Sequence, residues 1–287
     1  MLRTNTCKDL RWRWLPLTIF VFLLLLPATW SQAATVEEVF TKQISFQQSG
    51  YLELDNSNGG VEVKSWDKNE VEIKAYKRVR AGSREQAEEL MQDLKIEVVQ
   101  TASEIKIVTI TPQALKREGG FFNWLFNGDN NSFSVEYELT VPKSIDLNIK
   151  TTNGKVYCQQ IRGRLRLNST NGKITAREIA GLVRSKTTNG SLDIELISVP
   201  PDEEINFSTT NGSITLRLPE NYGAEVNLKT TNGHIDSDFS YSEQRDWSRQ
   251  HVSGIIGDGG GTLYCHTTNG SIRLYSRGHG SSEEVSL

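Results

Sequence analysis

The sequence is poor in the residue types that carry metal or redox chemistry. Its 287 residues include only 3 Cys and 4 His, and no two histidines have the spacing of metal ligands. We therefore expect no cofactor and no bound metal. The charge balance, 32 Lys and Arg against 35 Asp and Glu, is slightly acidic, which argues against a nucleic-acid partner.

Long apolar runs are also scarce. The one near the N-terminus, from Leu15 to Ala28, is shorter than the span of about 18 to 20 residues that a membrane helix needs. A basic stretch precedes it and Ser31-Gln32-Ala33 follows it, which is typical of a secretory signal peptide over residues 1–33. An uncleaved anchor is the alternative. Cleavage would remove four basic residues and one acidic one, change the net charge from −3 to −6, and leave no integral membrane span. The protein is expected to be exported: periplasmic, cell-surface or secreted.

Proline is rare, with 7 residues, whereas glycine recurs in a fixed context. The sequence TTNG occurs five times, and STNG and NSNG are close variants. Aliphatic residues precede most of these glycines by seven and by five positions and follow each by two, so each Asn-Gly pair joins two alternating strands. We call each such repeat a rung. The seven pairs are Asn58-Gly59, Asn153-Gly154, Asn171-Gly172, Asn189-Gly190, Asn211-Gly212, Asn232-Gly233 and Asn269-Gly270.

Two architectures fit this alternation: antiparallel hairpins with Asn-Gly turns, or a solenoid whose rungs stack in parallel. Parallel stacking is favoured because it explains why the same Thr, Asn and aliphatic residues recur in equivalent positions. Glycine would supply a positive φ at the corner, Asn amides would bond along the stack, and the Thr three positions before the glycine would point inward and bond a neighbouring rung. The motif is expected to be structural. We predict a mainly all-β fold, a parallel β-solenoid of stacked Asn-Gly rungs over residues 143–276, before a polar disordered tail at 277–287.

A small α+β portion is expected before the solenoid, over residues 34–142. One helix is predicted at about 83–94, with Ser83 as its N-cap and Gln86 completing a capping box. Strands are predicted at 70–77, 94–100, 104–110 and 132–142 from their alternation. The glycine-rich turn at 257–261 is expected to reverse the chain before the last rung.

Two cysteines, Cys158 and Cys265, follow the predicted signal peptide. They lie in the second and seventh repeats, at least five rung steps apart if the rungs stack in chain order. Five steps come to about 24 Å, whereas a disulfide needs Cα atoms within about 7 Å. We therefore expect no disulfide and two small core residues.

The chain resembles a known family in several long segments. These include SWDKNEVEIKAYK, YELTVPKSIDLNIKTTNGKV and GIIGDGGGTLYCHTTNGSIRL, and the similarity runs from about residue 40 to 275. It is similar to the bacterial putative-adhesin family of exported β-strand-repeat proteins, a domain of unknown function. This resemblance implies a β-solenoid with an envelope or surface location, and it brings no catalytic residues.

Carboxylates are the only candidates for catalysis. Asp193 and Asp236 both follow their glycine by three positions and point outward, and one rung, carrying Thr215, separates them if the rungs stack in chain order. Two rung steps are about 9.5 Å, the upper edge of the range for an inverting glycosidase. Outward acidic residues more often only solvate a strand, so no catalytic residue is predicted.

Outward rows of Thr and Lys are candidates for binding. Threonines such as Thr152 and Thr188 stand two positions before the glycine, and Lys150, Lys186 and Lys229 stand four before it. A row of outward threonines could suggest the flat surface of an ice-binding protein. The flexible lysines beside it argue against this, because they would disrupt such a surface. The rows could instead meet an anionic glycan or a phosphate-bearing polymer, or serve only for solubility.

An aromatic segment at residues 119–131 is a second binding candidate. It gathers Phe121, Phe122, Trp124, Leu125 and Phe126 between polar flanks. Such a cluster either contacts a partner or membrane, or caps the end of the solenoid and covers an edge that would otherwise aggregate.

The sequence thus predicts an exported, non-catalytic β-solenoid that serves binding or adhesion at the cell envelope. An envelope glycan or another surface protein is the expected class of partner. The alternatives are a solenoid enzyme that acts on polysaccharide and a purely structural or stress-linked envelope component.

The aromatic segment supplies a first test. Replacing Phe122 and Trp124 with Ser should lower the melting temperature by several degrees and increase aggregation, because burying each large apolar side chain is worth about 1.5 to 3 kcal/mol. Thermal unfolding followed by circular dichroism measures this. A double variant that melts like the original protein but no longer binds cells or vesicles would show that the segment is a contact site and not a cap.

Overall fold

The computed structural model describes residues 33–46, 49–111 and 131–277. Residues 1–32 of the predicted signal peptide and the aromatic residues 121–126 lie outside this part of the chain, as do residues 278–287 of the predicted tail. Across the described ranges, no helix is long and apolar enough to cross a membrane.

The described residues form a mainly β structure, which confirms the predicted fold class at that level. They contain twenty strands in one mixed sheet and a single helix. The first elements are β1 (Ala34–Ser45), β2 (Tyr51–Asn58), β3 (Val61–Trp66), β4 (Glu70–Ala81), α1 (Arg84–Asp93), β5 (Lys95–Gln100), β6 (Glu104–Ile110) and β7 (Ser132–Pro142). The later strands are β8 (Asp146–Asn153), β9 (Val156–Gln159), β10 (Arg162–Asn171), β11 (Ile174–Asn189), β12 (Leu192–Ser198), β13 (Glu204–Asn211), β14 (Ile214–Leu218), β15 (Ala224–Asn232), β16 (Ile235–Ser237), β17 (Tyr241–Trp247), β18 (His251–Ile256), β19 (Thr262–Asn269) and β20 (Ile272–Ser276).

Each Asn-Gly pair forms a corner between two strands. One strand ends at the Asn and the next begins two residues after the Gly, as β8 and β9 do around Gly154. The strands before the corners pair with one another to make the first arm of the stack, and the strands after the corners make the second arm. Strand β11 is long enough to serve both arms, because its start follows the corner at Gly172 and its end precedes the corner at Gly190.

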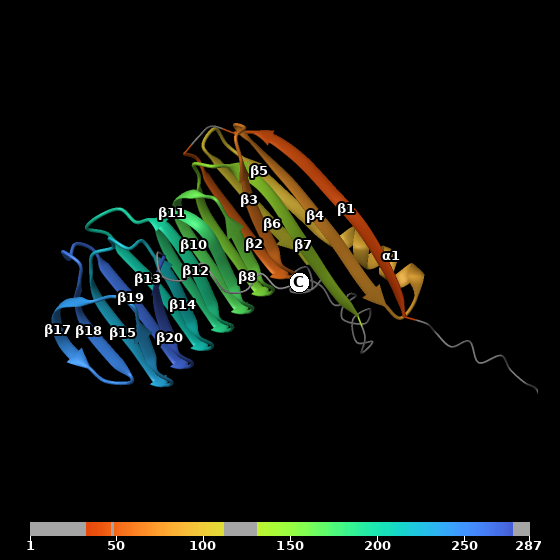
Figure 1. The fold of residues 1–287 in the computed structure, drawn as a ribbon. Coiled ribbons are helices and arrows are strands. Elements are labelled where there is room, and N and C mark those ends of the chain that lie inside the picture. The colour runs from red at the N-terminus through yellow and green to blue at the C-terminus, as the bar shows by residue number, and fades with distance from the viewer. Residues whose placement is uncertain (1–32, 47–48, 112–130, 278–287) are drawn as a thin grey trace, which may run out of the picture. The chain divides into compact units, whose positions relative to one another are not determined.

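Neighbouring rungs lie side by side with their strands parallel (Figure 1). Equivalent residues of the rungs are opposite one another. The asparagines follow the spatial order Asn58, Asn153, Asn171, Asn189, Asn211, Asn269, Asn232. The first rung, β2 and β3, joins this stack directly by pairing with β8 and β9.

The rungs do not stack in chain order, contrary to our assumption. Strand β19, which carries the seventh repeat, lies between β13 and β15 and pairs with both. Strand β15 does not pair with β13, so one strand position between them is open. The antiparallel β17–β18 hairpin covers the edge of β15 that faces away from this position. The predicted chain reversal at 257–261 then returns the chain into the open position.

The other end of the stack is mixed: β6 and β7 pair in parallel with the first rung, and β5, β4 and β1 follow in antiparallel pairs. Strands β6 and β5 continue the first arm beyond β2, and β7, β4 and β1 continue the second arm beyond β3. Helix α1 packs on β4 and β1 through Ala87, Leu90 and Met91. The predicted cap is present, since the Ser83 hydroxyl accepts a hydrogen bond from the Gln86 backbone N–H at 3.2 Å.

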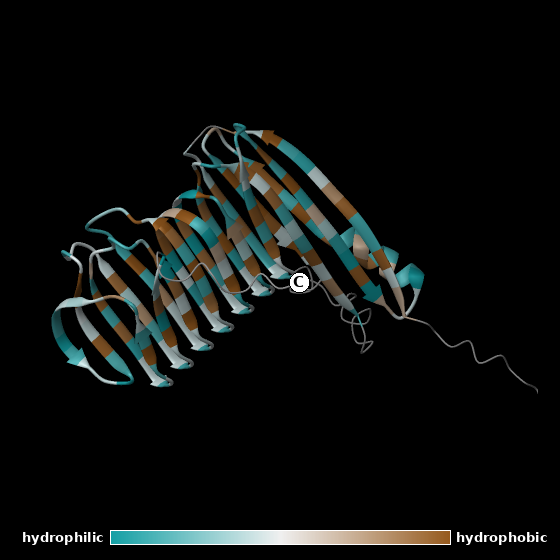
Figure 2. Ribbon diagram, viewed as in Figure 1, coloured by the Kyte–Doolittle hydropathy of each residue, from teal (hydrophilic) through white to brown (hydrophobic). Residues whose placement is uncertain are grey.

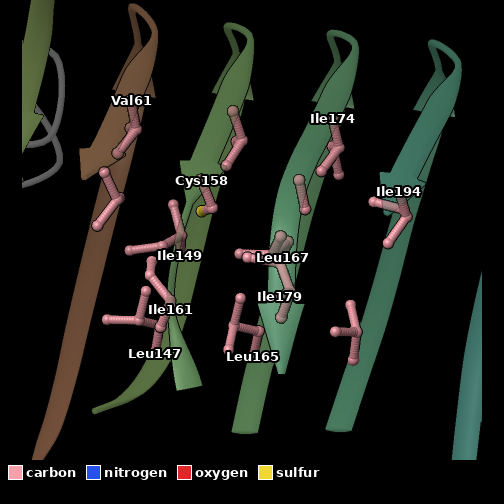
Figure 3. Packing of buried hydrophobic residues seen from close by; sticks show 14 of the residues in the cluster. Val61, Leu147, Ile149, Cys158, Ile161, Leu165, Leu167, Ile174, Ile179 and Ile194 are labelled. Atoms are coloured by element: carbon pink, nitrogen blue, oxygen red, sulfur yellow. The ribbon is translucent and has the colours of Figure 1, made fainter. Parts of the chain in front are cut away.

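The core lies between the two arms. Hydrophobic residues line up in bands across neighbouring strands (Figure 2), as the alternation predicts. Leu147, Leu165 and Leu167 of the first arm and Ile174 and Ile194 of the second are all at most 2% exposed. Figure 3 shows this layer, in which equivalent side chains of successive rungs lie beside each other.

Three hydrogen bonds connect each corner with the next. Between the rungs of Gly190 and Gly212, the Thr209 hydroxyl donates to the Gly190 carbonyl at 2.8 Å, the Gly190 N–H donates to the Asn211 carbonyl at 2.9 Å, and the Asn211 side-chain amide donates to Asn189 Oδ1 at 2.7 Å. The hydroxyl bond recurs from Thr151, Ser169, Thr187, Thr267 and Thr230, and the amide bond from Asn153, Asn171, Asn189, Asn269 and Asn232. The Thr ladder is buried and the Asn ladder is exposed, so the hydroxyl bonds are the ones shielded from water.

The glycines are required mainly by close contact and not by a positive φ, which corrects our explanation. Of the seven corner glycines only Gly59, at 120°, and Gly270, at 158°, have positive φ between +20° and +160°. A Cβ at any of the seven would lie well under 3.0 Å from a backbone carbonyl oxygen, which in six cases belongs to the glycine of the preceding rung. The stack is too tight at the corner for any side chain.

The new rung order also changes the distance between the cysteines. Cys158 lies in the second rung and Cys265 in the sixth position of the stack, so four steps separate them and not five. Both thiols are free and fully buried, and burial raises the pKa of Cys158 to about 12.

The corner contact supplies a second test. Gly190→Ala should destabilise the protein by at least about 1 to 3 kcal/mol, because the methyl group overlaps the Gly172 carbonyl and must push two rungs apart. Gly82→Ala is the matched control, since its nearest neighbour would be Gln86 Oε1 at an ordinary 3.5 Å. Urea denaturation of both variants measures the difference. Equal stability of the two would contradict the corner packing.

Candidate binding surface

The two candidate carboxylates are farther apart than we predicted. Because β20 lies between β14 and β16, the outward row runs Asp193, Thr215, Arg273, Asp236. Three rung steps come to about 14 Å, beyond the separation of about 6.5 to 9.5 Å that inverting glycosidases use. The proposed pair is therefore not brought together.

Asp193 is the centre of an ion-pair network on the outward face of the second arm. Its carboxylate accepts two bonds from Arg177, at 2.6 and 2.8 Å, one from Arg217 at 2.7 Å and one from Lys173 at 3.2 Å. Partial burial by itself would raise the pKa of Asp193, but these cations lower it well below its usual value. A carboxylate held ionised in this way suits a link across three rungs and is a poor proton donor.

Asp236 is also paired. His234 Nε2 lies 3.1 Å from its carboxylate and Arg273 Nε lies 3.8 Å away. Its side chain is 57% exposed, so its pairs are weaker than those of Asp193.

The outward face of the first arm carries two rows that the stacking makes continuous. Six positions before the glycine, the spatial order is Glu53, Asn148, Arg166, Arg184, Asn206, Tyr264, Asn227. Four positions before it, the order is Asp55, Lys150, Asn168, Lys186, Ser208, His266, Lys229. The first row carries its positive charge in the middle, at Arg166 and Arg184, whereas the lysines of the second row stand at its second, fourth and seventh positions.

Four cations on β10 and β11 form what we call the basic cluster: Arg164, Arg166, Arg184 and Lys186. Arg166 and Arg184 are direct partners on adjacent strands, about 4.8 Å apart at Cα. Within the described part of the chain, Arg184 has one carboxylate nearby, Glu204 at 3.7 Å, and the other three side chains have none within 4.0 Å. Like charges placed directly opposite each other destabilise a sheet, so the cluster is unfavourable for folding alone.

A hollow of about 490 Å³ lies over the basic cluster. Its walls include Tyr51, Asn148 and Leu182 beside the three arginines. A second depression of about 330 Å³ shares Arg166 and Arg184 and continues to Lys186, Asn206 and Ser208. The cluster is thus open to a ligand across several rungs.

Acidic residues border the hollow and do not neutralise it. Glu53 already accepts hydrogen bonds from Tyr51 and Asn148 and is paired with Lys106 at 3.0 Å, and its pKa is lowered chiefly by the Lys106 bond. Asp146 accepts a bond from the backbone N–H of Arg164 at 2.7 Å. Asp146 and Glu203 line the side farthest from the corners, whereas Lys186 lies on the corner side.

Only part of this surface was predicted from the sequence. The predicted lysine row and exposed threonines lie on this outward face. Arg164, Arg166 and Arg184 were not predicted. The sequence does contain a pattern that could have identified them, because arginines stand six positions before the glycine in two consecutive repeats.

Comparison with known proteins identifies the family. The family model described as Toastrack DUF4097 matches residues 96–275, and the chain belongs to this family. This confirms the resemblance to the putative-adhesin family. No curated protein matched the chain.

Solved structures are similar to this chain only at low sequence identity and low TM-score. A putative cell adhesion protein from Clostridium sporogenes is 10% identical with a TM-score of 0.39, covering 85% of this chain and 100% of the other. A putative adhesin from Bacteroides fragilis is 10% identical with a TM-score of 0.38, covering 83% and 97%. A putative lipid binding protein from Parabacteroides distasonis is 13% identical with a TM-score of 0.25, covering 82% and 96%. Similarities this low carry no argument about function.

The Asp193 network supplies a third test. Asp193→Asn should cost about 1 to 2 kcal/mol at pH 7, because Arg177 and Arg217 lose a charged partner. Since the folded protein lowers the pKa of Asp193, the stability from this group is present above the unfolded pKa and is lost as the pH falls below about 4. The difference between the two proteins should therefore shrink between about pH 5 and pH 2.

Chemical denaturation at a series of pH values measures this difference. Asp236→Asn is the control, since its carboxylate is exposed and only loosely paired, and it should change stability less. A difference for Asp193→Asn that stays constant with pH would show that the network is not electrostatic.

Proposed function

We propose that this protein is exported and serves non-catalytic binding or adhesion at the cell envelope, with the basic cluster as its contact surface. The observation that carries the proposal is the cluster itself. Arg164, Arg166 and Arg184 line the hollow and Lys186 lines the depression beside it, and among these four side chains only Arg184 has a carboxylate within 4.0 Å in the described part of the chain, whose net charge over the full sequence is negative. Cations that repel one another cost stability in isolation, so an external anion is the simplest reason for their position.

The stack suits a binding scaffold. We take the parallel, in-register rungs as a β-solenoid, in which the buried Thr ladder keeps successive corners at a constant distance. Side chains on such strands keep their spacing along the whole face. A ligand with a repeating structure could contact several rungs without any rearrangement of the protein.

The N-terminal pattern supports a location outside the cytoplasm. A basic stretch, an apolar run from Leu15 to Ala28 and a small-residue cleavage site are the parts of a signal peptide. Cleavage would release the stack, and retention would tether it to the membrane. Both fates leave the basic cluster free to meet an envelope component.

The two alternatives have less support. An enzyme acting on polysaccharide would need two carboxylates at a working distance, and Asp193 is occupied by three cations. A purely structural envelope component would have no use for arginines that line a hollow without a carboxylate partner, as Arg164 and Arg166 do among the described residues. The cluster therefore favours binding.

A binding assay with the full chain is our fourth test. Replacing Arg164, Arg166 and Arg184 with Gln should reduce binding to isolated bacterial envelopes at least tenfold and leave the melting temperature equal or slightly higher, because the variant loses an internal repulsion. Lys64, Lys74 and Arg78 replaced with Gln form the control. They change the net charge equally but lie on β3 and β4, and binding should persist.

Co-sedimentation with envelopes measures the binding, and fractionation of the producing cells should recover the full chain outside the cytoplasm. Equal envelope binding by both triple variants would refute the role of the basic cluster. Recovery of the chain in the cytoplasm would refute export.

A further inference from the structure

The basic cluster presents two guanidinium groups side by side. Arg166 and Arg184 are in-register partners on β10 and β11, and Arg164 lies two residues from Arg166 on the same outward face. A guanidinium group is a planar fork of donors that matches a carboxylate in a two-bond geometry. Two adjacent guanidinium groups are therefore better suited to a ligand with two adjacent carboxylates than to a ligand with a single point charge.

The cations are distributed over three successive rungs and do not lie along a single strand. Lys150 lies in the second rung, where it is paired with Asp55 at 3.1 Å. Arg164 and Arg166 lie in the third rung, and Arg184 and Lys186 in the fourth. The span from the second to the fourth rung is about 9.6 Å. A ligand that meets all of them must be extended across the strands and carry charges along its length.

The surroundings of the cations fit sugars. Tyr51 and the half-buried Leu182 line the hollow and offer an aromatic and an aliphatic surface for the faces of sugar rings. Asn148, Asn206 and Ser208 add neutral groups that can bond hydroxyls. A bare polyanion would need only the cations.

The bordering acids define the path of the ligand. Asp146, Glu203 and Glu204 lie on the side away from the corners, where they would repel an anionic chain. Lys186 and the threonine row lie on the corner side. The open path runs over the two rows of Arg and Lys, along the stack.

We propose that the ligand of this face is a linear acidic polysaccharide with a carboxylate on successive sugars, bound across the rungs. The proposal rests on the proposed function and names its ligand chemistry. Arg166 and Arg184 each hold the carboxylate of one of two successive sugars, and the flanking sugars extend towards Lys150 on one side and Asn206 on the other. Rings of the bound chain rest against Tyr51 and Leu182.

Polygalacturonate oligomers of increasing length are the probe, titrated into the full chain by calorimetry at low salt. Affinity should rise with length until the oligomer covers the first to fifth rungs and should then level off. Methyl-esterified polygalacturonate, which has the same sugars without the charge, should bind at least tenfold more weakly. Poly(glycerol phosphate), a polyanion without sugar rings, should also bind at least tenfold more weakly.

Two pairs of substitutions separate specific binding from simple attraction. Arg166→Gln with Arg184→Gln should lower the affinity for polygalacturonate at least tenfold. Arg166→Lys with Arg184→Lys keeps the charge but loses the paired donors, and it should still lower the affinity severalfold. Lys64→Gln with Lys74→Gln, on β3 and β4, should leave the affinity unchanged.

The outcomes distinguish the ligand from the general function. Equal binding of poly(glycerol phosphate), or unchanged affinity in the Arg→Lys pair, would overturn the acidic polysaccharide in favour of any polyanion. No binding of polygalacturonate, while envelopes still bind through the cluster, would overturn the ligand and leave the proposed function standing. Envelope binding that survives loss of the cluster would overturn both.

Discussion

The contact between successive corners is the constraint on which the rest of the structure depends. A glycine of one rung sits directly on the glycine carbonyl of the rung before it, and a threonine hydroxyl of the later rung bonds that same carbonyl inside the core. The contact leaves no room for a side chain and sets the register. A slip of one residue would turn every inward side chain outward, so the threonine, the glycine and the aliphatic columns all specify one alignment.

This register turns short sequence patterns into continuous surfaces. Residues that are 18 positions apart in the chain, such as Arg166 and Arg184, become neighbours across a strand pair. On the second arm the same rule brings three cations around Asp193 and links rungs. On the first arm it collects four cations of which only Arg184 has a carboxylate within 4.0 Å among the described residues. The two faces thus use similar residues differently: one is neutralised within the protein and stabilises it, and the other is the face for which we propose a ligand.

Much of the fold could be predicted, because the alternation of apolar and polar residues depends only on local geometry. The strands of the N-terminal portion, the helix capped by Ser83 and the buried columns follow from it. The order of the rungs could not be predicted, because each rung offers the same edge to any other rung. The position of β19 between β13 and β15 was decided by the β17–β18 hairpin, which covers the outer edge of β15 and leaves the inner one open. The predicted distance between Asp193 and Asp236 was wrong because it assumed that the rungs stack in chain order.

The sequence by itself determined the corners, the inward columns and the family of this protein, since the same few residues are needed wherever two rungs meet. Only the tertiary structure decided which rungs are neighbours and therefore which charges face each other. It showed that Asp193 is surrounded by cations, that the asparagine ladder is exposed to water, and that Arg166 and Arg184 share one hollow. The physical reason is that a hydrogen-bonded strand edge is indifferent to chain order, whereas electrostatic interactions depend on the actual distance between groups.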